Sequence, residues 1–171
     1  MGEAQFFLGE FDAANRALEP LVRLPSAAGR TAAGLVGHHL FRDLGRDDSE
    51  VEKLLKRAGR QRDEYPVDLA ELYVARGKFA RAARILRAES RRGNSSAPIL
   101  LGNLYSDRLQ QNKRAERYYL RGVELGDAFS AYNLAAILSQ QGRHSESQTW
   151  LKYAADHGDE KAQARMNEIG A

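Results

Sequence analysis

The sequence predicts an all-α fold in which about five antiparallel helix pairs form a right-handed superhelical solenoid, closed by a C-terminal capping helix. Two observations predict it. Residues 65–93 contain two helical patterns in tandem, separated by Gly77, and this pair of patterns recurs along the chain every 32 to 34 residues. Such a period is typical of helical hairpins that are each too small to bury their own apolar face and therefore stack on their neighbours.

The hairpin predicted at residues 65–93 defines the repeating unit. One face of its first helix carries Leu69, Ala70 and Tyr73, and one face of its second carries Ala82, Ile85, Leu86 and Glu89. The small side chains of Ala70 and Ala82 allow two antiparallel helices to approach closely, while larger neighbours interlock around them. Gly77 then marks the turn between the helices.

Two motifs indicate how often this hairpin recurs. The turn motif of Gly77, Phe79 and Ala82 also lies 68 positions earlier, which is two steps of 34. Motifs like that of the first helix include Leu101, Gly102 and Tyr105, then Leu134, Ala135 and Leu138; motifs like that of the second begin at Ala14, Glu50, Ala115 and Ser147. We therefore expect one helical-repeat domain over residues 1–171, with repeats at about 1–27, 28–61, 62–94, 95–127 and 128–158 and a cap at 159–171.

These motifs resemble the tetratricopeptide repeat over almost the whole chain. The last two repeats, which close at Gly126 and with the run 154–159, resemble the related Sel-one-like repeat. The resemblance implies a solenoid whose first helices line a concave groove, and a non-catalytic role as a protein-interaction scaffold. The resemblance is weaker before Tyr65. There, repeat two has residues 37–41 and Glu50 at positions where the family pattern has small residues.

The first two repeats are predicted to consist of helices on either side of one loop. A helix at about 11–24 should kink or end near Glu19, because Pro20 removes a backbone donor. The short segment before it, Glu3 to Leu8, is the end of a further helix. A loop at 25–29 should then precede helices at about 31–44 and 49–58, with Asp48 or Ser49 capping the second.

In the remaining repeats, repeat three should begin near Asp63, with Pro66 in its first turn. The run 93–96 is a turn and cap before helices at about 97–107 and 113–125. Between these two helices Leu109 stands in place of the glycine, and its spacing to Ala115 is one residue longer than in repeat three. Helices at about 129–140 and 145–157 form repeat five, and the cap at 160–169 carries Ala162, Met166 and Ile169 on one side.

Composition excludes several classes of protein. The 171 residues include no cysteine, which excludes a disulfide scaffold, thiol chemistry and sulfur-ligated zinc. Neither a long apolar run nor a leader is present, so we expect no membrane insertion and a cytoplasmic location. The chain could still be a fragment of a longer one.

The sequence offers little for catalysis. His38 and His39 are adjacent and point about 100° apart on a helix, so they cannot chelate one ion as an i, i+4 pair could. There is no glycine-rich phosphate loop and no nucleophile elbow. We therefore expect neither an enzyme nor a bound metal or cofactor.

A basic stripe supports an alternative function. Arg84, Arg87 and Arg91 fall within about 60° on the second helix of repeat three. Clustered guanidinium groups could bind RNA or another polyanion. A solvated outer face explains them better, since second helices of such solenoids lie on the convex side and need charge for solubility, and no aromatic residues are interleaved with them to stack bases. We prefer the solvated face, and therefore do not expect nucleic acid as a partner.

The groove is the predicted binding surface for a protein or peptide. On the first helices, positions turned away from the apolar seam include Glu71, Ile99, Asn103, Ser106, Tyr132, Asn133 and Ser139. Asparagine side chains there could pair with a ligand's backbone, since each has donors and an acceptor. Ile99 stands where the family's carboxylate-binding members have a lysine, so an internal peptide segment is the expected ligand. The remaining possibility is an accessory domain of a larger enzyme.

Overall fold

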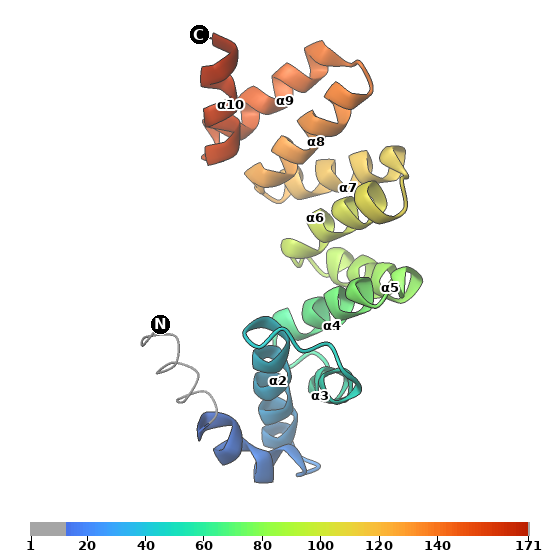
Figure 1. The fold of residues 1–171 in the computed structure, drawn as a ribbon, viewed down its shortest axis with the longest axis vertical. Coiled ribbons are helices and arrows are strands. Elements are labelled where there is room, and N and C mark those ends of the chain that lie inside the picture. The colour runs from blue at the N-terminus through green and yellow to red at the C-terminus, as the bar shows by residue number, and fades with distance from the viewer. Residues whose placement is uncertain (1–12, 171) are drawn as a thin grey trace. The chain divides into compact units, whose positions relative to one another are not determined.

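The computed structural model describes residues 13–170, and these are helical without any strand, which confirms the predicted all-α fold (Figure 1). After a helical stretch at 13–22, the elements are α2 (Ala27–Arg42), α3 (Ser49–Ala58), α4 (Glu64–Ala75), α5 (Phe79–Arg91), α6 (Ser96–Asn103), the π-helix η1 (Leu104–Arg108), α7 (Asn112–Glu124), α8 (Ala128–Gln140), α9 (His144–Asp156) and α10 (Glu160–Gly170). The helix predicted at residues 3–8 lies outside the described residues. None of the helices in residues 13–170 is long and apolar enough to cross a membrane.

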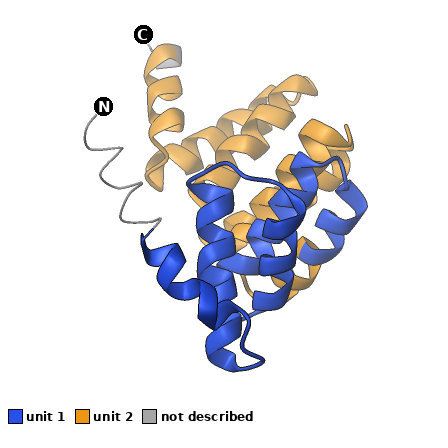
Figure 2. Ribbon diagram, turned by 60° about the horizontal axis from the view of Figure 1, so that its bottom comes forward, with its two compact units in different colours: residues 1–85 blue, residues 86–171 orange. Residues whose placement is uncertain are grey.

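The chain divides into two compact units, unit 1 (Met1–Ile85) and unit 2 (Leu86–Ala171), so the division falls within α5 (Figure 2). Unit 1 has its core between α2, α3 and α4, where Val51, Leu55 and Leu72 are almost completely buried. The core at the C-terminal end of unit 2 is built from small and aliphatic side chains of α8, α9 and α10: Ala131, Ala135, Leu151, Ala154 and Ala162.

The two helices on either side of the first loop in unit 1 end and begin at other residues than the sequence predicted. The helix at 13–22 continues past Pro20 and ends three residues beyond Glu19. The next helix, α2, begins at Ala27 rather than near residue 31. Ser26 caps it by accepting a hydrogen bond from the amide of Gly29 (3.1 Å), so the predicted loop at 25–29 was too long.

In repeat two the sequence alignment was wrong by one residue. Glu50, predicted at the close helix contact, is exposed, whereas Val51 is completely buried. On the facing helix the small residue is Gly37: a Cβ added there would lie only 3.0 Å from the Cβ of Leu54. The predicted cap of α3 is confirmed, because the carboxylate of Asp48 accepts from the amides at positions 50 and 51 (2.9 and 3.3 Å).

In repeat four the extra residue lies in the helix and not in the turn. The helix widens into η1, where the amide of Leu109 donates to the carbonyl of Leu104, five residues earlier (3.1 Å). The residue that takes the left-handed conformation of Gly77 (φ 67°) is Gln110 (φ 51°). The prediction that Leu109 replaces the glycine was therefore wrong.

Helix α10 packs on the core of unit 2 through the side predicted from its sequence. Ala162 is completely buried, and Met166 is partly buried against the same cluster. The amide of Ala162 donates to the carboxylate of Asp159 (2.8 Å), which fixes the start of the helix. This placement carries Lys161 and Arg165, one turn apart on α10, to the edge of α8.

Candidate functional site

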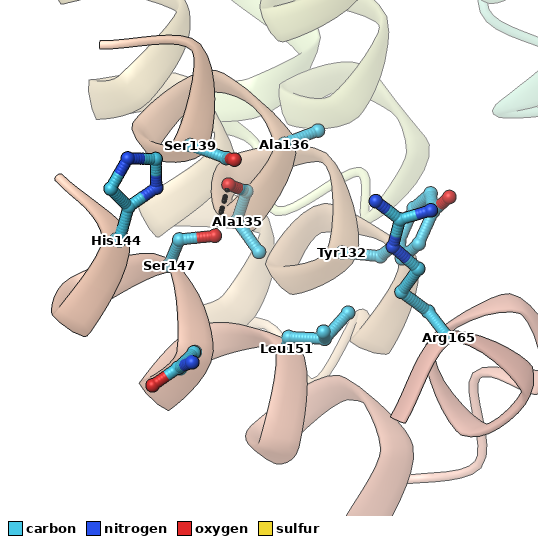
Figure 3. Close-up of a pocket in the computed structure, with 9 residues that line it drawn as sticks. Tyr132, Ala135, Ala136, Ser139, His144, Ser147, Leu151 and Arg165 are labelled. Atoms are coloured by element: carbon cyan, nitrogen blue, oxygen red, sulfur yellow. Dashed lines mark hydrogen bonds between the residues drawn. The ribbon is translucent and has the colours of Figure 1, made fainter. Parts of the chain in front are cut away.

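A pocket of about 490 Å³ opens in unit 2 along α8, between α9 and α10 (Figure 3). Tyr132, Ala136 and Ser139, spaced four and three residues apart, form one line along α8 and lie in its wall. The described residues that line the pocket are Tyr132, Ala135, Ala136, Ser139, His144, Ser147, Gln148, Leu151 and Arg165.

Small side chains and one hydrogen bond hold the pocket open. Ala135 and Leu151 form an apolar floor and are themselves 3% and 7% exposed. The hydroxyl of Ser147 donates to the carbonyl of Ala135 (2.7 Å), which joins α9 to α8 beneath the pocket. Because Ala136 presents only a methyl group, no side chain fills the space above this floor. The floor is therefore apolar and buried, while the rim of hydroxyl and amide groups remains open to a ligand.

One end of the pocket is aromatic and cationic. Figure 3 shows Tyr132 and Arg165 on the same side of the pocket, with His144 and Ser139 at the other side. The ring of Tyr132 stacks on that of Phe129 (centroids 6.0 Å apart), and the ammonium group of Lys161 lies 5.1 Å from the centre of the Phe129 ring. Phe129 is 36% exposed. Phe129 and Tyr132 thus form an aromatic surface with Lys161 and Arg165 beside it.

Among the residues that line the pocket, only Arg165 carries a permanent charge. It makes a long ion pair with Glu168 (3.6 Å), and both side chains are about two-thirds exposed. An ion pair this exposed contributes at most about 1 kcal/mol, so the guanidinium group can exchange it for a ligand. The pocket therefore favours negative over positive charge.

Asn103 of α6 and Asn133 of α8, two of the predicted groove residues, contact each other. The amide oxygen of Asn103 accepts hydrogen bonds from the hydroxyl of Tyr119 (2.8 Å) and from the amide of Asn133 (3.5 Å). Burial raises the pKa of the Tyr119 hydroxyl, which keeps it protonated as the donor. Asn103 and Asn133 are thus brought together, but the acceptor of Asn103 already serves the protein. Ile99 and Ser106 are half-buried, and Ser106 lies in η1, where the wider turn changes its direction relative to Asn103.

Glu71 lies in unit 1, in an ionic cluster that the sequence did not reveal. Its carboxylate forms an ion pair with Arg42, which also donates through Nε to Asp68 (2.7 Å). Asp68 is completely buried, and its other oxygen pairs with Nδ1 of His38 (2.6 Å). The cluster joins α2 to α4. Glu71 therefore contributes to packing between these helices and is not a free groove carboxylate.

The alternative basic stripe lies on α5. Arg84 and Arg91 are exposed and Arg87 is half-buried. Glu89 on the same helix is 3% exposed and pairs with Arg92 (3.2 Å), as expected for the inward side. Within residues 13–170, no three histidine or carboxylate side chains are arranged to hold a metal ion.

Comparison with known proteins supports the repeat assignment. The tetratricopeptide-repeat family model matches residues 67–88 and 128–152. No curated protein sequence matches the chain. The crystal structure of MamA is similar with a TM-score of 0.74 and 18% identity, over 95% of this chain and 97% of MamA.

Two further solved structures share the fold. YrrB, described as a TPR protein with an unusual peptide-binding site, has a TM-score of 0.66 and 17% identity, over 95% of this chain and 87% of YrrB. A Sel1 repeat protein from Oxalobacter formigenes has a TM-score of 0.60 and 21% identity, over 78% of this chain and 59% of its own. At these identities the likeness establishes the fold alone. Residues 67–88 and 128–152 therefore match the tetratricopeptide repeat, and the chain shares its all-helical fold with tetratricopeptide and Sel1 repeat proteins.

Proposed function

We propose that the chain is a non-catalytic scaffold that binds a peptide segment of a partner protein in the pocket along α8. The observation that carries the proposal is the pocket itself. Its apolar floor of Ala135 and Leu151 lies beneath a rim of hydroxyl and amide groups. Its volume of about 490 Å³ is within the range of specific ligand sites, about 300–1,000 Å³.

The chemistry of the rim suits a peptide. An extended segment presents alternating side chains and unpaired backbone donors and acceptors. Ser139 and Gln148 can pair with that backbone, and Tyr132 adds an amphipathic ring with little conformational freedom to lose on binding. The peptide-binding site described for YrrB, which shares the fold, lends further support.

Blocking the pocket tests the proposal. Random peptides displayed on phage would be selected on the purified chain, and retained peptides would be measured against Ala136→Arg. Because Ala136 is exposed on α8, arginine fills the pocket without entering the core. We expect affinity to fall at least about tenfold.

The matched control is Ala164→Arg, which changes an exposed alanine on α10 outside the pocket lining. It should bind the selected peptides with the parental affinity. Selection of no peptide, or equal loss in both variants, would contradict the proposal.

A further inference from the structure

The charges at the aromatic end of the pocket determine which peptides it selects. Arg165 lies in the wall and Lys161 one turn earlier on the same helix, above the ring of Phe129. Among the residues that the structure describes, no aspartate or glutamate lines the pocket. A peptide that enters therefore meets positive charge with no carboxylate in the wall to oppose it.

Two carboxylates close in sequence to Phe129 and Lys161 are engaged as helix caps. Asp127 caps α8, where it accepts from the amide and hydroxyl of Ser130 (3.1 and 2.5 Å). Asp159 accepts from the amide of Ala162 at the start of α10. Glu168 pairs with Arg165 itself, and this pair is long (3.6 Å) and exposed. The two cations consequently have capacity for an anionic ligand, which an arginine can bind through two parallel hydrogen bonds.

We propose that the pocket selects an acidic peptide segment, in which an aspartate or glutamate side chain pairs with Arg165 and Lys161 and an adjacent apolar side chain lies on Ala135 and Leu151. The inference rests on the proposed peptide-binding function. The stacked rings of Phe129 and Tyr132 lie beside the two cations, with Lys161 over the Phe129 ring and Tyr132 on the same side of the pocket as Arg165 (Figure 3). They exclude water from one side of the ion pair, which strengthens it relative to a pair in open solvent.

The geometry also specifies what is rejected. A lysine or arginine in the ligand at the same place would face the guanidinium and ammonium groups at close range. Such like-charge contacts act against the wrong partner even where the apolar contacts are unchanged. The acidic residue therefore determines specificity, whereas the apolar floor supplies affinity to any peptide.

Charge reversal tests the inference. Random peptide selection would be performed in parallel on the parent chain, on Arg165→Glu and on the control Arg117→Glu, an exposed arginine of α7 outside the pocket. We expect acidic residues to be enriched by the parent and by the control, and lysine or arginine to be enriched by Arg165→Glu. Acidic peptides selected on the parent should bind Arg165→Gln about tenfold more weakly.

Circular dichroism and the fluorescence of Trp150 would verify that each variant is folded; Lys161→Glu serves as a second reversal if Arg165→Glu is not. Peptides that are blocked by Ala136→Arg yet show no acidic preference would overturn this inference and leave the proposed function intact. If no peptide is retained, both proposals fail. Retention of a single-stranded oligonucleotide that depends on Arg165, with no peptide retained, would identify the surface as a polyanion site and overturn the peptide proposal.

Discussion

Replacing Glu52 by glutamine should destabilise unit 1 in a pH-dependent way. Glu52 lies on α3 with its side chain only 13% exposed. Its carboxylate accepts from the ammonium group of Lys56 (2.6 Å), the guanidinium group of Arg76 (2.5 Å) and the hydroxyl of Tyr73 (3.0 Å). Arg76 and Tyr73 belong to the C-terminal end of α4, so the carboxylate joins the two helices.

The pKa of Glu52 sets the magnitude. Hydrogen bonding from Lys56, followed by that from Tyr73 and the charges of Lys56 and Lys78, lowers it from 4.5 to about 2. At about 1.4 kcal/mol per pKa unit, the ionised form would stabilise the fold by at most about 3.5 kcal/mol. Lys56 is half exposed and therefore screened, so we expect Glu52→Gln to cost about 1–2 kcal/mol at neutral pH.

The sign of the pH dependence follows from the direction of the shift. A folded-state pKa below the unfolded one contributes stability above about pH 4.5, and this stability disappears as the pH falls through about 2. The difference in unfolding free energy between parent and Glu52→Gln should therefore be constant near neutral pH and approach zero toward pH 2. Other carboxylates titrate in both proteins and cancel in the difference.

Urea unfolding followed by circular dichroism at several pH values measures this difference. Glu124→Gln is the control, because its pair with Arg121 is exposed on both sides and should contribute less than about 0.5 kcal/mol. If Glu52→Gln proves no more destabilising than this control, or if its effect persists unchanged at low pH, the ionic contact does not stabilise the fold as argued.

Three other changes test the packing. Gln110→Gly should raise the free energy of unfolding by about 0.5–1 kcal/mol, because glycine adopts φ 51° without the Cβ contact that strains glutamine. A lower melting temperature of this variant would contradict the expectation. Ala115→Arg should cost several kcal/mol, because the completely buried methyl group is replaced by a bulky cation, and an unchanged thermal midpoint would refute the assigned contact. Truncation after residue 159 should destabilise or oligomerise the chain by exposing Ala131 and Leu151, unless size-exclusion chromatography and melting show a monomer of parental stability.

Much of the fold could be predicted because it depends on local rules. Asp48 caps α3 at the predicted residue, since capping needs only a carboxylate two or three positions before free amides. Helix α3 has the predicted ends, and the apolar side of α10 is the one read from Ala162 and Met166. The prediction was wrong in repeat two and in η1. At both places a shift of one residue changes which side chain occupies each position of the repeat. Only the structure shows that Val51 is the buried residue and that Gln110 adopts the left-handed turn conformation.

The sequence by itself determined the helices, their period and the line of Tyr132, Ala136 and Ser139 along one face of α8, because residues on one helix share a fixed geometry. Only the tertiary structure decided that Arg165, more than thirty residues later, lies in the same pocket as Tyr132. It also paired Asp68 with Arg42 and His38, which removes Glu71 from the free groove residues. Contacts between helices depend on how their side chains interlock, and that information is distributed over many residues far apart in the chain.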